Sequence, residues 1–232
     1  DHGWIERYYI RPDFLFKYYG FEWVHPWPGD GMYWHFVLLA VLSLMITVGL
    51  FYRFAMTVFF FAFTYVFLLD QARYLNHFYL VSIVAFLMLL VPASQTYSVD
   101  SWIRTKLGRP APRTIPYWAI WLFVAQFEVL YLYAGIVKVN PDWLRLEPLA
   151  MWMARREDFP LIGHLFVHDW VVAIGAYGSI ALHLFGAPLL LFKRTRLYIA
   201  IVYGCFHLTN HFMFQIGIFP WLTMAGTMMF FD

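Results

Sequence analysis

The sequence has 232 residues, of which 62% are apolar and 13% are charged, and its formal net charge is +2. A soluble domain carries about 25% charged residues, so a water-soluble fold of this size lacks the charge to cover its surface. The composition therefore predicts an integral membrane protein. The small net charge without a long basic run argues against nucleic acid as a partner, and a single cysteine, Cys205, excludes a disulfide framework.

The first 32 residues differ in character from the rest of the chain. They mix charged residues with aromatic ones and end in the loop sequence His25-Pro-Trp-Pro-Gly-Asp-Gly. Such a mixture is typical of a segment that lies in the membrane interface. We therefore expect residues 1–32 to form an interfacial helical segment and loop, followed by a transmembrane domain over residues 33–232.

Apolar runs of the length that a bilayer requires fill most of residues 33–232, since a spanning helix needs about 20 mainly apolar residues. The last run, 197–231, is too long for one crossing, and polar residues with a glycine interrupt it near 210–217. The sequence thus predicts an all-α, polytopic transmembrane helical bundle of about seven spans. The other candidate spans are Tyr33–Phe51, Phe54–Leu69, Phe78–Val91, Tyr117–Val139 and Val171–Phe192.

The distribution of lysine and arginine predicts the orientation of these spans. Basic residues gather in the 92–115 connection and in a turn over 193–196, and span counting puts both on one side, together with Arg53. We expect this side to be cytoplasmic, although basic residues accompanied by acidic ones also occur in the opposite loop, 140–169. The basic residues of the first two segments are Arg104, Lys106, Arg109, Arg113, Lys193, Arg194 and Arg196.

Span counting also brings polar side chains at four helix ends to the other membrane face. They end spans two, four and six and begin span three. We therefore predict one polar site at this face, and these side chains are Asp70, Asn76, His77, Lys138, Asn210 and His211.

Each of these residues also has a purely structural interpretation. Lys138 is at a helix end, where lysines commonly extend their amine to the interface. His77 fits a hydrogen-bonded structural histidine, and Asp70 fits a cap of span three or a partner of Arg73. Near Lys138, Gly135 permits close approach of another backbone, and Asn140-Pro-Asp-Trp ends the helix.

Two further features lie within the apolar runs. Glu128 is a carboxylate near the middle of span four, which fits either a functional group or a protonated carboxyl bonded to a neighbouring helix. His207 and His211 are four residues apart on one helix face, a spacing that metal pairs use. Because no acidic third ligand lies nearby in the sequence, we predict no metal site.

A lysine that is half-buried in an apolar wall is more easily deprotonated, because desolvation disfavours its charged form. A neutral lysine is a competent general base near neutral pH, and a neighbouring neutral histidine can relay the proton. Such a pair, open to lipid and surrounded by aromatic residues, suits proton abstraction from an amphiphilic phenol or quinol.

At these same residues the sequence resembles the vitamin K-dependent gamma-carboxylase family and its bacterial relatives, the horizontally transferred transmembrane (HTTM) domain proteins. The similarity covers roughly residues 30–232. The matching segments are Gly49-Leu-Phe-Tyr-Arg53, Tyr65-Val-Phe-Leu-Leu-Asp70, Asn76-His77, Tyr97-Ser-Val-Asp100, Ala134-Gly-Ile-Val-Lys138 with Asp142-Trp143, His207-Leu-Thr-Asn210 and Ile216-Gly-Ile-Phe219.

The resemblance implies a gamma-glutamyl carboxylase-like lyase and epoxidase in a bacterial inner membrane, with its site toward the extracytoplasmic face. It implies a reduced vitamin K-type quinol as cofactor, O2 and CO2 as co-substrates, and a glutamate-containing peptide or protein as substrate. By this resemblance Lys138 matches the catalytic lysine and His77 the histidine that assists it. The matching supporting polar positions are Asp70, Asn76, His207 and Asn210.

A second function from another class also fits the sequence. It is a non-catalytic HTTM-type membrane module that binds a lipid, a quinone or a partner protein, in peptide maturation or immunity. The family's double lysine is Val137-Lys138 here, so only its second lysine is present.

Overall fold

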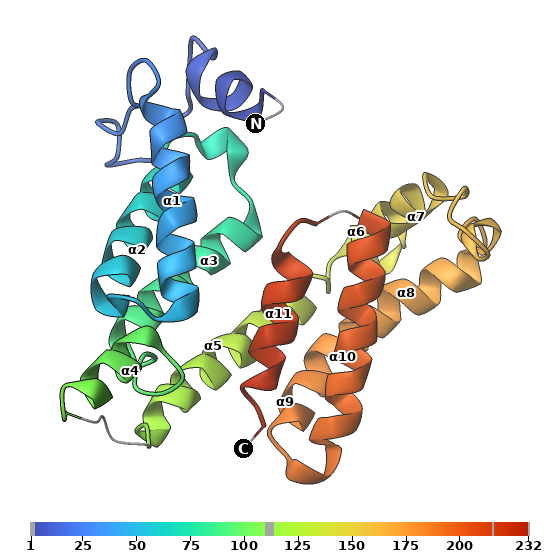
Figure 1. The fold of residues 1–232 in the computed structure, drawn as a ribbon. Helices are drawn as coiled ribbons and strands as arrows, with labels where there is room; N and C mark the ends of the chain where they lie inside the picture. Colours follow the sequence, from blue (N-terminus) through green and yellow to red (C-terminus); the bar gives the residue numbers. More distant parts are fainter. Residues whose placement is uncertain (1–2, 110–113, 215, 232) are drawn as a thin grey trace. The chain divides into compact units, whose positions relative to one another are not determined.

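The computed structural model describes residues 3–109, 114–214 and 216–231, and these residues form helices and connecting loops without any strand. The predicted all-α class is confirmed. The chain divides into two compact units, Asp1–Ala119 and Ile120–Asp232, and α5 (Tyr117–Ile136) begins in the first and continues through the second. Figure 1 shows the course of the chain within each unit.

In the first unit, three apolar helices run alternately up and down. A tight turn joins α1 to α2 at Gly49, whose φ of 66° lies in the left-handed region that glycine adopts readily. Buried contacts hold α1 against α2 through Leu39, Ala62 and Val66. The helices of this unit are α1 (Gly31–Val48), α2 (Tyr52–Leu68), α3 (Asn76–Leu90) and α4 (Val99–Lys106), with a 3-10 turn over Gln71–Arg73.

The N-terminal segment is helical only over residues 4–10, which include the π turn Glu6–Ile10, so the expectation of a helical segment holds for these residues alone. The remaining described residues before α1 follow turns and loops that three prolines and three glycines interrupt, over the span 3–30. Val24 anchors the segment, because it is buried together with Met32 and Leu69. The predicted interfacial position of residues 1–32 stays a prediction.

The second unit packs short and long helices around a separate apolar core. Leu149, Val172, Ala176 and Met213 come from three different helices and are buried together. Trp143 and Phe214 pack at the edge of this core, so the segment that follows α5 and the end of α10 lie at the same end of the unit. The helices after α5 are α6 (Pro141–Leu144), α7 (Glu147–Ala154), α8 (Asp169–Ala181), α9 (Ala187–Leu190), α10 (Lys193–Phe214) and α11 (Phe219–Met228).

A π-helical turn, Leu182–Gly186, connects α8 to α9, so that α8, the π turn and α9 form one continuous helical segment, Asp169–Leu190, the α8–α9 rod. Pro188 explains its place, because proline has no N–H to donate to the carbonyl four residues earlier and its ring crowds that carbonyl. The turn before a proline therefore loosens, and a wider turn is one way in which a helix accommodates this. His183 lies in the π turn.

Four helical segments are long and apolar enough to cross a membrane: Gly31–Val48, Tyr117–Ile136, Asp169–Leu190 and Lys193–Phe214. The expected count of about seven is not confirmed. The apolar helices α2 and α3 have 17 and 15 residues, and α11 has only 10, which corresponds to about 15 Å of helix against a hydrocarbon core of about 30 Å.

The last apolar run divides as expected but with unequal parts. The break falls between Phe214 and Phe219, inside the predicted interval, and Gly217 there has a positive φ of 58°. The predicted turn over 193–196 is wrong, because these basic residues form the first turn of α10. Within that turn, Arg196 Nε donates to the carbonyl of Leu190 at 3.0 Å, which satisfies a carbonyl at the end of α9. Arg113 lies outside the described residues.

Candidate functional site

Lys138 follows α5 in a segment that the sequence fixes tightly. α5 ends at Ile136, and Asn140 then caps α6 by accepting a hydrogen bond from the backbone N–H of Trp143 at 3.0 Å. Pro141 occupies the first position of α6, which needs no N–H donor. Two helix boundaries within five residues therefore hold Lys138 in a short, ordered corner, as the motif predicts.

The Lys138 amine lies among apolar and aromatic groups. Its Nζ donates to the carbonyl of Ala134 at 2.7 Å and lies 5.5 Å from the ring centroid of Trp143. Burial lowers the pKa of Lys138 from its ordinary value near 10.5 to about 8. A substantial fraction of this amine is therefore neutral near physiological pH, and a neutral amine can take up a proton.

The π turn of the α8–α9 rod packs against α5 one helical turn before Lys138. A Cβ at Gly135 would lie 2.7 Å from Leu184 Cδ2 and 3.0 Å from His183 Cβ, so only glycine fits there. The close approach at Gly135 is made by side-chain atoms of Leu184 and His183 and not, as predicted, by another backbone. His183 is thereby placed near Lys138, and the two side chains interact electrostatically.

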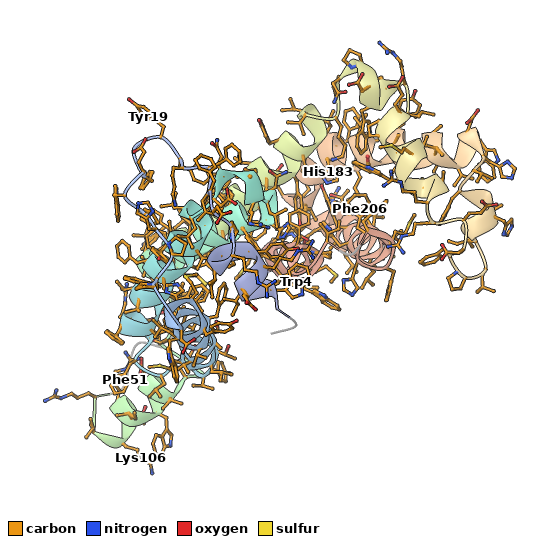
Figure 2. All side chains as sticks on the ribbon, turned by 90° about the horizontal axis from the view of Figure 1, so that it is seen from above. Trp4, Tyr19, Phe51, Lys106, His183 and Phe206 are labelled. Atoms are coloured by element: carbon orange, nitrogen blue, oxygen red, sulfur yellow. The ribbon has the colours of Figure 1, made fainter. Side chains whose placement is uncertain are left out.

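Its hydrogen bond fixes the tautomer of His183. Nδ1 lies 2.6 Å from the carbonyl oxygen of Ser179, and a carbonyl can only accept, so Nδ1 carries the proton. In the neutral ring, Nε2 is then the nitrogen with the free electron pair. His183 is 4% exposed, and its ring meets that of Phe206 edge-on at 5.2 Å. Figure 2 labels both residues among the side chains of the second unit.

His207 lies in an aromatic cluster beside His183. Its ring stacks on Tyr203 with centroids 5.9 Å apart and meets Phe219 edge-on at 6.3 Å. Although His207 is 1% exposed, neither of its ring nitrogens has a hydrogen-bond partner among the described residues. Buried polar atoms are satisfied in the great majority of cases, so two orphaned nitrogens on one side chain mark a place where a ligand or water belongs.

Tyr131 connects this cluster to α11. Its hydroxyl lies 2.7 Å from Thr227 Oγ1 and donates to the carbonyl of Thr223 at 2.9 Å, and its ring stacks on Tyr203 at 4.3 Å. Glu128 lies one turn earlier on α5 and interacts electrostatically with Tyr131, and its Oε2 is buried without a partner in the described part of the chain. The predicted hydrogen bond of Glu128 to a neighbouring helix is not seen for this oxygen.

The predicted site residues of the first unit are in a different environment. Asp70 is 7% exposed, and its carboxylate accepts from the backbone N–H groups of Phe16 and Ala72, both at 3.1 Å. It also pairs with Arg73 at 3.3 Å, which confirms the structural interpretation of this residue. Asn76 and His77 begin α3, the first exposed and the second half-buried.

The residues of the predicted shared face are divided between the two units. Asp70, Asn76 and His77 lie at one end of the first unit, where α2 ends and α3 begins. Lys138 and Asn210 lie toward one end of the second unit, since their helices end beside the same core. That these two groups form one site stays a prediction. No group of three metal-ligating side chains occurs among residues 3–109, 114–214 and 216–231, which includes His207 and His211.

Sequence patterns did not single out His183, Tyr131 or Tyr203 as candidates. Each lies inside an apolar run, where a histidine or tyrosine looks like any other packing residue. One signal was present for His183: a proline five residues later, which predicts a distorted turn in the helix before it. Distorted π turns are frequent at functional sites, so His183 followed by Pro188 is a sequence signal for a functional residue.

Comparison with known families identifies the chain's relatives. The family model described as "HTTM domain" matches residues 1–232, the whole chain. HTTM domains are associated with vitamin K-dependent carboxylase-like membrane proteins. No solved structure matches the chain.

Proposed function

The chain belongs to the HTTM domain family, and we propose that it is a membrane enzyme of the gamma-carboxylase type with Lys138 as its general base. The observation that carries this proposal is a lysine whose pKa burial lowers to about 8, next to a histidine of fixed tautomer. A base works best when its pKa lies near the working pH, and an unperturbed lysine does not meet that condition.

The side chains around Lys138 suit a flat, amphiphilic quinol. Trp143, half-buried beside Lys138, offers an aromatic surface. The stacked pair Tyr131 and Tyr203 and the unpartnered His207 are buried behind it and form the aromatic wall of this region in the described part of the chain. When bound, a reduced vitamin K-type quinol supplies the electrons that reduce O2 and, with them, the strong base that removes a γ-hydrogen from a glutamyl residue before CO2 adds.

The chain's own residues handle protons in this proposal. The hydrogen bond from Lys138 Nζ to Ala134 orients the neutral amine, whose electron pair accepts a proton from a phenolic hydroxyl. His183 stays neutral beside this amine: Ser179 keeps its Nδ1 protonated, which leaves Nε2 as a hydrogen-bond acceptor. The assisting role of His77 and the supporting roles of Asp70, Asn76, His207 and Asn210 belong to the same proposal.

We also propose that the chain is a multi-pass protein of a bacterial inner membrane with Lys138 toward the extracytoplasmic face. In the second unit, the basic residues of the first turn of α10 lie at the end of that helix opposite Asn210. A membrane-impermeant thiol reagent should label cysteines placed at Asn140 and Asn210 from one side and at Thr195 from the other. Labelling of Asn140 and Asn210 from opposite sides would contradict this arrangement.

A direct assay tests the catalytic proposal. Purified protein in lipid nanodiscs is incubated with reduced vitamin K and O2, with and without a glutamate-containing peptide and labelled CO2, and epoxide and fixed label are measured. We expect epoxide from the wild type and none above background from Lys138→Ala. A wild type that binds the quinone but forms no epoxide with any peptide would instead favour the non-catalytic binding module.

A further inference from the structure

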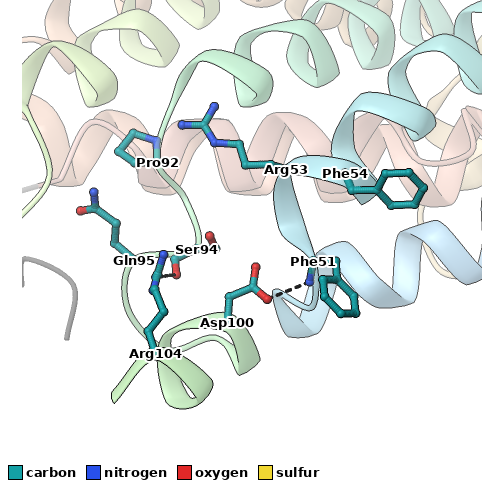
Figure 3. Close-up of a pocket in the computed structure, with 8 residues that line it drawn as sticks. All are labelled: Phe51, Arg53, Phe54, Pro92, Ser94, Gln95, Asp100 and Arg104. Carbon is teal, nitrogen blue, oxygen red and sulfur yellow. Dashed lines mark hydrogen bonds between the residues drawn. The ribbon is translucent and has the colours of Figure 1, made fainter. Parts of the chain in front are cut away.

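A second polar cluster lies in the first unit, at the end opposite Asp70. An open pocket of about 400 Å³ forms there between the beginning of α2, the end of α3 and α4. Polar lining comes from Arg53, Ser94, Gln95, Asp100 and Arg104, and apolar lining includes Phe51 and Phe54 (Figure 3). The predicted orientation places this end on the cytoplasmic side of the membrane.

Backbone hydrogen bonds build the floor of the pocket. Asp100, in the first turn of α4, accepts from the N–H groups of Phe51 and Tyr52 at 2.8 and 2.9 Å, and its own N–H donates to Gly49. A Cβ at Gly49 would lie 2.4 Å from Ser98 Cβ, so only glycine lets α4 sit this close. The negative charge of Asp100 is thus already engaged by the N-terminus of α2.

Two guanidinium groups reach this pocket from different elements, Arg53 from α2 and Arg104 from α4 (Figure 3). Each donates to a backbone carbonyl that fixes its position, Arg53 to Leu89 and Arg104 to Ser94 at 2.7 Å. Arg104 Nε is buried and has no hydrogen-bond partner among the described residues. Held guanidiniums with donors to spare are the recognition geometry for phosphate oxygens.

Gln95 adds a requirement on the ligand. Its Oε1 is also buried without a partner in the described part of the chain, and this oxygen can only accept a hydrogen bond. A ligand that satisfies the pocket therefore carries an anionic group and, beside it, a donor such as a hydroxyl. A glycerol or similar headgroup next to a phosphate has both.

The apolar wall indicates that the ligand carries hydrocarbon. Phe51 and Phe54 are each 64% exposed, and the neighbouring Trp102 on α4 is 62% exposed. Aromatic residues at this density are typical of the headgroup level of a bilayer, and anionic lipids are enriched in the cytoplasmic leaflet. An acyl chain can follow the exposed side of α2 from Phe54 while its headgroup stays at the arginines.

We propose that this pocket binds the phosphate of an anionic phospholipid with a hydroxyl-bearing headgroup, with Arg53 and Arg104 as phosphate ligands and Gln95 as acceptor for the headgroup. The site is independent of the chemistry at Lys138, because its residues all belong to the first unit. It assigns a lipid-anchoring role to the end of the first unit that lies opposite Asp70.

The test measures transfer of fluorescent lipid to the purified full chain in neutral detergent. Wild type should prefer phosphatidylglycerol over phosphatidylcholine by about tenfold or more, and Arg53→Gln and Arg104→Gln should each abolish most of this preference. Lys106→Gln is the matched control, since Lys106 is a cation of the same helix that does not line the pocket. Gln95→Leu should weaken binding of phosphatidylglycerol but not of phosphatidylmethanol, an anionic phosphodiester without a headgroup hydroxyl.

Three results would overturn the proposal. The first is a wild type without preference for the anionic lipid, and the second is an equal loss in Lys106→Gln, which would indicate only general attraction between charges. The third is that the lipid binds no tighter than glycerol phosphate and that millimolar glycerol phosphate displaces it. This result would assign the pocket to a soluble phosphate ester. Thermal unfolding of each variant, compared with wild type, excludes loss of the fold as the cause.

Discussion

Two half-buried lysines, one in each unit, show how differently the two regions use polar groups. Lys17 in the first unit donates to the carbonyls of Val24 and Leu69, at 2.5 and 3.1 Å. Burial lowers its pKa, and the negative charge of Asp70 acts in the opposite direction. Lys138 in the second unit donates to a carbonyl of its own helix, Ala134, and burial alone lowers its pKa to about 8. The first lysine joins distant segments, whereas the second bonds only within its own helix end, which fits the proposed role as a base.

The same contrast holds for the buried acid and the buried imidazole. Asp70 has two backbone donors and an arginine as partners, and it ties residue 16 to the end of α2. His207 is more deeply buried and has no partner for either ring nitrogen among the described residues. Satisfied polar groups stabilise a fold, and unsatisfied ones lower its stability, so they persist where function needs them.

The largest expected effect separates the two lysines. Lys138→Ala should lower quinol epoxidation by about 10²–10⁴-fold, the usual contribution of a general base, with the fold retained. Lys17→Ala is the matched control: it should weaken the docking of the N-terminal segment and leave turnover per folded molecule unchanged. Epoxide yield and limited proteolysis measure the two properties. Equal losses of activity in both variants would remove the distinction between these lysines.

Substitutions of Asp70 and His207 should change stability in opposite directions. Asp70→Asn loses an ion pair and weakens two charge-assisted bonds, which should cost about 1–3 kcal/mol. His207→Phe replaces an unsatisfied imidazole by an apolar ring of similar shape, so it should be neutral or stabilising while turnover falls. Denaturant or thermal unfolding in detergent gives the sign. A destabilised His207→Phe would indicate that His207 is a structural residue.

Gly135 and Gly178 offer a matched pair on neighbouring helices of the second unit. Gly135→Ala forces a Cβ against Leu184 and His183 and should cost about 1–3 kcal/mol and displace the π turn. A Cβ at Gly178 meets nothing within 4 Å, so Gly178→Ala should stabilise its helix by about 0.5–1 kcal/mol. Unfolding and turnover measured for both variants check this. Comparable stabilities of the two alanine variants would disprove the close approach at Gly135.

The smallest expected effect is a pH dependence of stability. Because the pKa of Lys138 is about 8 in the fold and about 10.4 in an unfolded chain, the folded state binds fewer protons between these values. The cost of burying the ammonium is therefore present in full below pH 8 and disappears above about pH 10.4. Lys138→Met should raise Tm by about 2 °C or more at pH 7 and by nothing at pH 10.5. An equal shift at both pH values would point to packing instead of charge.

Composition and local motifs were sufficient for the class and for part of the site. A charged fraction of 13% predicts a membrane protein whatever the topology, and the helix class follows. The corner around Lys138 was predictable because its parts, Gly135 and Asn140, act within a few residues of one another. Interactions between residues that are close in the sequence can be predicted from the local sequence alone.

Longer-range features were not predictable in the same way. The hydrogen bond from the Phe16 N–H to Asp70 joins residues 54 positions apart, and no local sequence pattern predicts it. The count of about seven spans is not confirmed, since hydropathy does not show where α2, α3 and α11 end. His183 was not predicted because it lies in an apolar run and in a π turn. The hydrogen bonds of a π turn join residues five apart, a spacing that the α-helical hydrophobic pattern does not show.

The pH dependence of epoxide formation tests the central claim most directly, namely that Lys138 in the second unit is the base. The rate should rise by up to tenfold per pH unit below pH 8 and level off above it, with a half-maximal value near 8 that belongs to the lysine and its histidine partner together. Lys138→Arg should be inactive throughout, because a guanidinium stays protonated. A rate that does not change between pH 6 and 9, or an active Lys138→Arg variant, would contradict the claim.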